Sequence, residues 1–175
     1  TPMRLRDDAL MNACRIAIEF NRLVREAGEP MVGTIGWIKT EPGAMNVVPG
    51  EATFIAELRD LEHERIEIVV NKLMEFTNGM NITYQKILDD RASMMDERIM
   101  HAIESSARQR GYTYRYISSG AGHDAIPMSR IVSTGMIFVP SKNGISHNKD
   151  EWTDWVDIEK GTNVLLDVVK MLDNQ

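Results

Sequence analysis

Two apolar segments near the start of the chain restrict the folds that its first half can adopt. The segment Met31–Thr40 is rich in β-branched and aromatic residues and ends at the turn sequence Glu41-Pro42-Gly43. The segment Ala52–Leu58 alternates apolar and polar side chains, which is the pattern of a strand with one buried face. Because only a short connection separates them, we expect the two strands to pair as antiparallel neighbours.

Helical patterns flank this pair on both sides. Apolar residues recur with a helical period over Asp7–Ala27, and a glycine and a proline follow as a stop. A second helix is predicted from Glu62 to about Asn78, and a strand over Ile82–Leu88. The order helix, strand, strand, helix, strand is that of a ferredoxin-like unit without its first strand, which we expect upstream of Thr1. The missing initiator methionine likewise predicts that the chain is a piece of something longer.

The pattern changes after the polar sequence Asp89-Asp90-Arg91. Helices and strands then alternate, which is typical of an α/β layer. We therefore expect an α/β fold class overall, with a ferredoxin-like α+β domain over residues 1–92 and a separate α/β piece over residues 93–175. The predicted elements of the second piece are a helix (96–110), a strand (112–117), a short helix (124–130), a strand (136–139) and a final helix (158–172).

Composition excludes several classes of function. Hydrophobic residues make up 43% and charged residues 26% of the chain, as in a folded globular protein. The net charge of -6 argues against binding to a nucleic-acid backbone, and no apolar run approaches the roughly 20 residues that span a bilayer. Cys14 is the only cysteine, so no intrachain disulfide can form, and we expect a reducing, cytoplasmic location.

Two glycine-containing loops follow predicted strands, and each carries a histidine. His123 lies in Ser118–Asp124, and His147 lies in the loop that opens at Pro140 and reaches Trp152. In open α/β sheets ligands bind beyond the carboxyl ends of neighbouring strands, so the two loops can converge on one site. The alternative is that both are ordinary turns between a strand and a helix.

The histidines do not complete a metal site. His63 falls among charged residues in the first turn of a helix and His101 on a polar helix face, so we interpret both as solvated surface residues. Catalytic zinc takes three protein ligands and one open position, which two loop histidines do not supply. We expect no self-sufficient metal centre in this chain.

Arg59 and Asn46 are candidate binding residues with ordinary alternatives. Arg59 ends the alternating strand with Glu57 on the same face, which is either a surface ion pair worth under about 1 kcal/mol or a planar fork for a substrate carboxylate. Asn46 precedes Val47-Val48-Pro49-Gly50 and is either a turn former or an amide donor to an anion.

Several segments, in order along essentially the whole chain, resemble the carbamoylase and allantoate amidohydrolase branch of the M20 metallopeptidase family. The sequences GAGHDA and GISHNKDEW are the most specific to that branch. The segments that carry the resemblance are Thr1–Met3, Arg6–Leu10, Gly33–Gly36, Pro42–Gly50, Glu57–Asp60, Ser119–Ala125 and Gly135–Trp152.

The resemblance implies an architecture and an activity. Members are homodimers in which a catalytic domain with two divalent metal ions, zinc or manganese, is interrupted by a ferredoxin-like lid that mediates dimerisation. They hydrolyse N-carbamoyl or ureido C–N bonds of small carboxylate substrates. By this resemblance, residues 1–92 are the lid and residues 93–175 the closing segment of a zinc-peptidase-like catalytic domain.

The resemblance also implies roles for single residues. His147 matches the last metal ligand, and Asn46 and Arg59 match lid residues that hold the substrate carboxylate, often across the dimer. Gly122 and His123 match a substrate-contacting loop near the metals. The other ligands, the general-base glutamate and a lid histidine match positions upstream of Thr1, so we expect the chain alone to bind no metal ion and to be inactive.

Two other functions stay open. The chain can be a dimerisation or interaction module whose hydrolase motifs are idle. The parent protein can also be an aminoacylase or a peptidase of the same fold.

Overall fold

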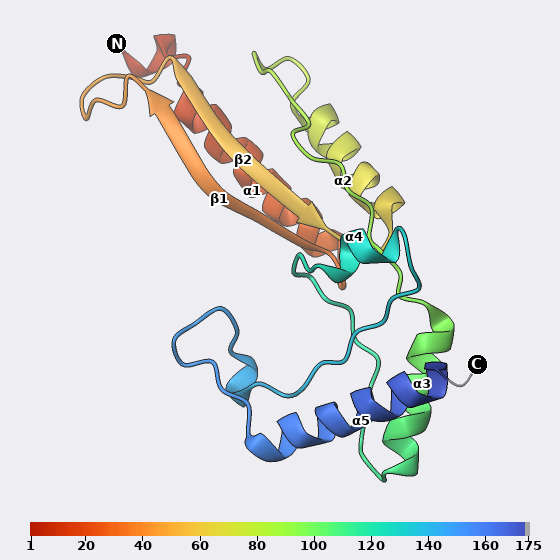
Figure 1. The fold of residues 1–175 in the computed structure, drawn as a ribbon. Coiled ribbons are helices and arrows are strands. Elements are labelled where there is room, and N and C mark those ends of the chain that lie inside the picture. Colours follow the sequence, from red (N-terminus) through yellow and green to blue (C-terminus); the bar gives the residue numbers. More distant parts are fainter. Residues whose placement is uncertain (174–175) are drawn as a thin grey trace. The chain divides into compact units, whose positions relative to one another are not determined.

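The computed structural model describes residues 1–173, which form two compact units (Figure 1). The first unit is Thr1–Ala92, and the second begins at Ser93. Within the described residues, no helix is both long and apolar enough to cross a membrane.

The first unit is built on an antiparallel pair of strands, as predicted. Strand β1 (Val32–Glu41) pairs with β2 (Glu51–Arg59), in a register that runs from Val32 opposite Arg59 to Glu41 opposite Glu51. The register shifts between Ile35 and Trp37, where one extra residue of β1 forms a bulge. The pair therefore forms a long hairpin with residues 42–50 as its loop.

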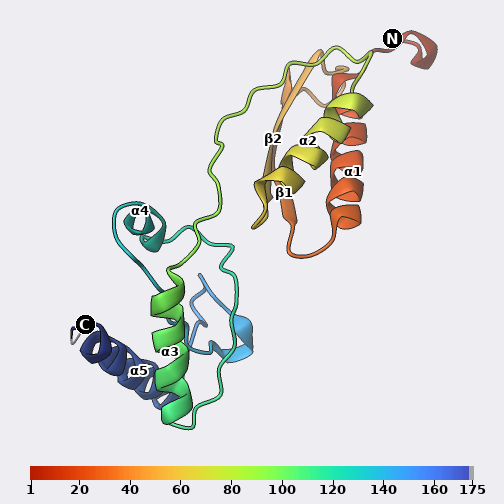
Figure 2. The ribbon, with the colours of Figure 1, turned by 90° about the vertical axis from the view of Figure 1, so that its right-hand side faces the viewer.

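Two helices cover one face of this hairpin. They are α1 (Ala9–Ala27) and α2 (His63–Phe76), and a short 3-10 helix, η1 (Met3–Leu5), precedes them (Figure 2). The carboxylate of Asp8 accepts hydrogen bonds from two backbone N–H groups of the first turn of α1, which would otherwise lack partners. The core between helices and hairpin consists of Phe20, Leu23, Val24, Met31 and Val69.

The predicted third strand of this unit is wrong. Residues 82–88 make no strand pairing, and the only sheet in residues 1–173 has two strands. A strand leaves its N–H and C=O groups unpaired until a neighbour supplies partners. In the ferredoxin-like arrangement the last strand lies beside the first, and the described residues contain no strand ahead of α1.

The second unit contains the predicted helices and none of the predicted strands. It consists of α3 (Glu97–Gln109), α4 (Ala125–Ser129), the 3-10 turn η2 (Lys142–Gly144) and α5 (Trp155–Asp173). Helices α3 and α5 cross each other in Figure 1, and the core that they share consists of Ala107, Val164 and Val168. Residues 112–117 and 136–139 were predicted to be strands, and that prediction was wrong. In the part of the chain described here, they form no strand and join no sheet.

These unpaired segments are still fixed against the helices. A Cβ atom at Gly135 would lie 2.4 Å from the side chain of Ile99 on α3, and one at Gly161 on α5 would lie 2.6 Å from Val139. The hydroxyl groups of Tyr114 and Tyr116 both donate to the Glu104 carboxylate on α3. Residues 112–117 and 135–139 therefore have defined places without a sheet.

A polar contact locks α3 to α5. The Asp167 carboxylate on α5 accepts hydrogen bonds from Arg110 Nε at 2.5 Å and Nη2 at 2.8 Å, and from the buried Ser106 hydroxyl at 2.8 Å. These donors favour the ionised form, so they lower the pKa of Asp167 from 3.8 to about 2, the Arg110 guanidinium contributing most.

The Asp167 contact predicts a loss of stability in acid. A carboxyl whose pKa is lowered on folding stabilises the folded state above its ordinary pKa, and this contribution disappears as pH falls from about 4 towards 2. Amide hydrogen exchange of α3 and α5, corrected for its intrinsic pH dependence, should show protection falling across this range in the native chain. Asp167→Asn should be less protected at pH 6 and should lose much of this pH dependence.

Asp157→Asn is the matched control, because Asp157 lies on the same helix and pairs with Lys160 at the surface. Equal pH dependence in the Asp167→Asn variant and the native chain would contradict the prediction.

Gly33 is predicted to be required for the packing of β1 on α1. A Cβ atom there would lie 2.6 Å from Val24 Cγ2 and 2.9 Å from Phe20 Cζ, so the Gly33→Ala methyl overpacks the core. We expect it to lower the free energy of unfolding by about 1–3 kcal/mol. Chemical denaturation, monitored by circular dichroism, measures the free energy of unfolding of each variant. Gly36→Ala on the same strand is the control, since a Cβ atom there meets nothing within 4 Å; equal effects of the two variants would refute the packing argument.

Candidate functional site

The two candidate binding residues of the first unit lie at opposite ends of the hairpin. Asn46 is exposed in the loop beyond the Glu41–Glu51 pair. Arg59 belongs to the residue pair at the other end of the hairpin, its last rung, where it lies opposite Val32. Strand β2 has nine residues, so eight steps of about 3.3 Å separate its ends by roughly 26 Å. One molecule the size of an amino acid cannot contact both residues of the same chain.

Arg59 projects from the face of the hairpin that the helices leave uncovered. Its neighbour Leu58 packs into the core, and successive side chains of a strand point to opposite faces. The Arg59 side chain is 47% exposed, and its guanidinium donates from Nε at 3.1 Å and Nη2 at 2.8 Å to Glu57 Oε1. The carboxylate of Glu57 is itself 55% exposed. The structure thus contains the predicted surface ion pair, and its carboxylate position is open to solvent.

His123 is held by a hydrogen bond that defines its chemistry. Its Nδ1 atom accepts from the backbone N–H of Ala125 at 3.0 Å, at the start of α4. A neutral imidazole that accepts at Nδ1 carries its proton on Nε2, so the exposed edge of His123 is a hydrogen-bond donor. Gly122 beside it is exposed, and a Cβ atom there would meet nothing within 4 Å. The loop can therefore approach and donate to a ligand oxygen.

His147 lies on a closed surface loop between η2 and α5. Its backbone has a positive φ of 55°, and its N–H donates to Glu151 Oε2 at 2.7 Å. The loop is closed by the Lys142 N–H donating to the Trp152 carbonyl at 2.8 Å, and by a short hydrogen bond between Ser141 and Ile145. Within the described residues, the exposed His147 ring makes no hydrogen bond. A ring nitrogen is available for a metal ion.

A dinuclear metal site is not complete in the described residues. His147 can act as one exposed imidazole ligand, but among the described residues it belongs to no group of three or more His, Cys, Asp or Glu side chains placed to hold a metal ion. The structure places each loop within the second unit, and their predicted convergence remains a prediction.

The sequence analysis missed one cluster of possible metal ligands. His63, Glu67 and Asp89 in the first unit offer one ligand atom each, all within 4.8 Å of one another. The prediction that His63 is a solvated surface residue was wrong, because its side chain is only 16% exposed and its Nε2 lies 3.4 Å from Glu67 Oε1. The spacing of His63 and Glu67, one helical turn apart, was visible in the sequence, whereas the approach of Asp89 was not.

This cluster already contains a cation. The ammonium of Lys86 lies 3.0 Å from Glu67 Oε1 and 2.9 Å from Asp89 Oδ2. The two carboxylates raise the pKa of Lys86, and the ammonium lowers the pKa of Asp89. A metal ion would have to displace this ammonium, so the network fixes residues 86–89 to α2 without a metal.

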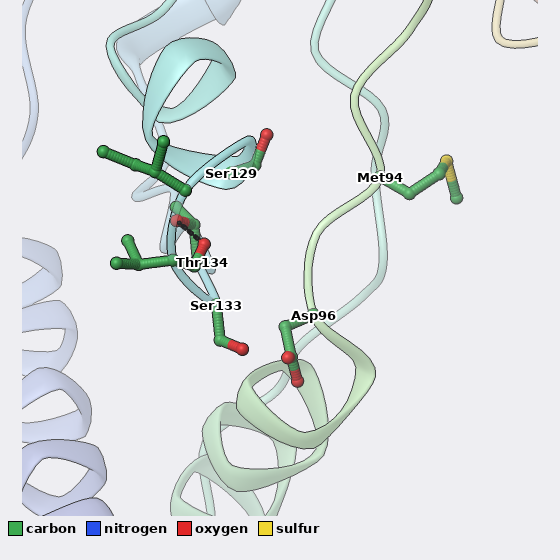
Figure 3. A pocket seen from close by; sticks show the side chains of 7 residues that line it. Met94, Asp96, Ser129, Ser133 and Thr134 are labelled. Carbon is green, nitrogen blue, oxygen red and sulfur yellow. Dashed lines mark hydrogen bonds between the residues drawn. The ribbon is translucent and has the colours of Figure 1, made fainter.

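The second unit has a pocket that none of the predicted site residues lines. It has a volume of about 370 Å³, and Figure 3 shows Asp96 and Ser133 on its walls. Asp96 caps α3 by accepting from the backbone N–H groups of Arg98 and Ile99. Hydrogen bonding, first from Ser133, lowers the pKa of Asp96 to about 2. The carboxylate is thus engaged in capping the helix.

The sequence matches one protein family along most of its length. The model of peptidase family M20/M25/M40 matches residues 9–171. The chain is 39% identical to an uncharacterised hydrolase of Haemophilus influenzae, over 97% of this chain and 43% of that protein. It is 36% identical to an N-carbamoyl-L-amino-acid amidohydrolase of Paenarthrobacter aurescens, over 99% of this chain and 43% of that protein. It is 30% identical to an allantoate amidohydrolase of Escherichia coli, over 94% of this chain and 42% of that protein.

Solved structures give the same result for the fold. The crystal structure of AtUAH in complex with glyoxylate superposes with a TM-score of 0.85 and 27% identity, covering 97% of this chain and 42% of that one. These matches confirm the predicted α/β class and the resemblance to the carbamoylase and allantoate amidohydrolase branch. The chain spans less than half the length of the relatives it matches.

Proposed function

We propose that this chain, which belongs to peptidase family M20/M25/M40, is the C-terminal part of a metal-dependent amidohydrolase. Its substrates would be N-carbamoyl-L-amino acids or allantoate, with hydrolysis of a linear C–N bond. The observation that carries the proposal is the 36% identity, over 99% of the chain, to a protein named N-carbamoyl-L-amino-acid amidohydrolase. We place the protein in the cytoplasm, where a single cysteine stays reduced.

Arg59 would bind the substrate carboxylate. Two of its N–H groups already donate to a carboxylate oxygen of Glu57 on the uncovered face of the hairpin. A substrate carboxylate that replaces Glu57 keeps the same charge pairing and gains the planar geometry that suits a guanidinium. The energetic cost of the exchange is small, because both side chains of the existing pair are about half exposed.

Asn46 would act on the substrate of a second copy of the chain. The roughly 26 Å of strand between the two ends of the hairpin supports this, since Asn46 and Arg59 cannot contact one small substrate from the same lid. We therefore propose a homodimer formed through residues 1–92, in which each lid contributes to two sites. The hairpin length is the observation that supports this arrangement.

The second unit would supply a donor and one metal ligand. The Nε2–H of His123 would donate to a substrate oxygen, with Gly122 allowing close approach. His147 would hold one of two divalent ions, zinc or manganese, and such ions when bound activate water for hydrolysis. The described residues do not complete that centre, so their own contribution is to bind and orient the substrate.

The first test is Arg59→Ala in the full-length enzyme. We expect kcat/KM for an N-carbamoyl-L-amino acid to fall by about tenfold or more, because a lost charge-assisted hydrogen bond costs about 1.5–3 kcal/mol. Arg22→Ala is the matched control, since Arg22 is a similarly exposed arginine of the same unit that pairs with Glu19 and Glu26 on its own helix. An unchanged kcat/KM in Arg59→Ala would remove Arg59 from the binding site.

The second test uses the 175-residue chain itself. We expect no hydrolysis of N-carbamoyl amino acids or allantoate with added zinc or manganese, because the described residues offer one of several required ligands. Light scattering at micromolar concentration should show a dimer if the lid carries the interface. Metal-dependent turnover by this chain would overturn the expected inactivity, and a strictly monomeric chain would count against dimerisation through residues 1–92.

A further inference from the structure

The side chain of Arg65 joins two parts of the first unit that are distant in sequence. Its Nε atom donates to Asp60 Oδ2 at 2.9 Å. Its Nη2 atom donates to the carbonyl oxygens of Ala27 at 2.8 Å and Gly28 at 2.9 Å. One guanidinium on α2 therefore holds the residue that follows β2 and the turn that leads from α1 into β1.

Asp60 is the buried half of this contact. Its side chain has no exposed surface, and its other carboxylate oxygen accepts from the backbone N–H of Glu62 at 3.0 Å. A carboxylate that is removed from water needs both its charge and its lone pairs satisfied. Arg65 and the turn backbone meet this need, so the position of Asp60 is fixed in the fold.

The contact closes the end of the hairpin that carries Arg59. The last rung pairs Arg59 with Val32, and Asp60 comes directly after Arg59. On the other strand, the turn held by Arg65 is tied to the start of β1 by the Met31 N–H, which donates to the Gly28 carbonyl at 3.1 Å. Both backbone segments next to this rung are thus held by one side chain, whereas strand ends otherwise tend to fray.

We propose that Asp60 and Arg65 are positioning residues for Arg59. Their ion pair fixes the terminal rung of the hairpin and with it the direction in which the Arg59 guanidinium leaves the sheet. The inference rests on the proposed function of Arg59 as the carboxylate-binding residue. An arginine is required at position 65, because a lysine has no planar fork to reach the carboxylate and the carbonyl groups together.

A double-mutant cycle in the full-length enzyme tests the proposal. Arg65→Lys should raise KM for an N-carbamoyl-L-amino acid by about fivefold or more while kcat changes by less than about twofold. The carboxamide analogue of the substrate, which lacks the carboxylate, should show no such increase. In an Arg59→Ala background, Arg65→Lys should cause little further loss of kcat/KM, because the residue it positions is gone.

Asp60→Asn is the second variant, and it should reproduce the KM effect with a side chain of the same shape if Arg65→Lys does not fold. If the losses of kcat/KM caused by Arg65→Lys and by Arg59→Ala are fully additive, the positioning role is overturned. The same holds if Arg65→Lys raises KM for the carboxamide analogue as much as for the substrate, since the Asp60–Arg65 pair would then be a structural contact only. An unchanged kcat/KM in Arg59→Ala would instead refute the proposed function, so the two failures are distinguishable.

Discussion

The ion pair between the buried Asp60 carboxylate and the partly exposed Arg65 guanidinium is the contact on which the first unit depends most. It joins the end of β2, the start of α2 and the carboxyl end of α1. The apolar core lies beside it and is small, with five buried residues at its centre. Because a buried carboxylate without its partner is costly, this pair favours one arrangement of the hairpin and the two helices over others of similar apolar burial.

The helices were predictable because a helix satisfies most of its own hydrogen bonds. Asp8 and Asp96 cap α1 and α3 as their positions before the periodic segments suggest, and Gly28 ends α1 with a φ of 71°. The antiparallel pair was also predictable, since both strands and their connection lie within 28 residues of one another. Local sequence contains all the information that these elements need.

The three remaining strand predictions were wrong for a physical reason. Residues 82–88, 112–117 and 136–139 have apolar side chains typical of strands, but a strand exists only with a hydrogen-bonded neighbour, and pattern does not show whether one is present. The contacts of Gly135 with Ile99 and of Val139 with Gly161 show that the last segment nevertheless has the close packing of a core element.

The candidate site residues likewise include features that local sequence indicates and features that depend on the fold. Arg59, His123 and His147 could be proposed as candidates because each lies in a short, distinctive local sequence. The separation of Asn46 from Arg59 follows from the length of β2 once that strand is recognised. The approach of Asp89 to His63 depends on a chain reversal after α2, so it could not be predicted from spacing.

The proposed substrate binding and the proposed hydrolysis therefore depend on the described residues to different degrees. The two strands of the hairpin that carries Arg59 pair with each other, and the first unit supplies its apolar core and the Asp60–Arg65 ion pair, so contacts within this unit hold the side chain that is proposed to bind a carboxylate. His147 depends on a loop closed by a few hydrogen bonds and follows a segment without a strand partner. Since precise placement of catalytic groups comes from rigid, fully bonded surroundings, the binding half of the proposed activity is the half that these residues preorganise.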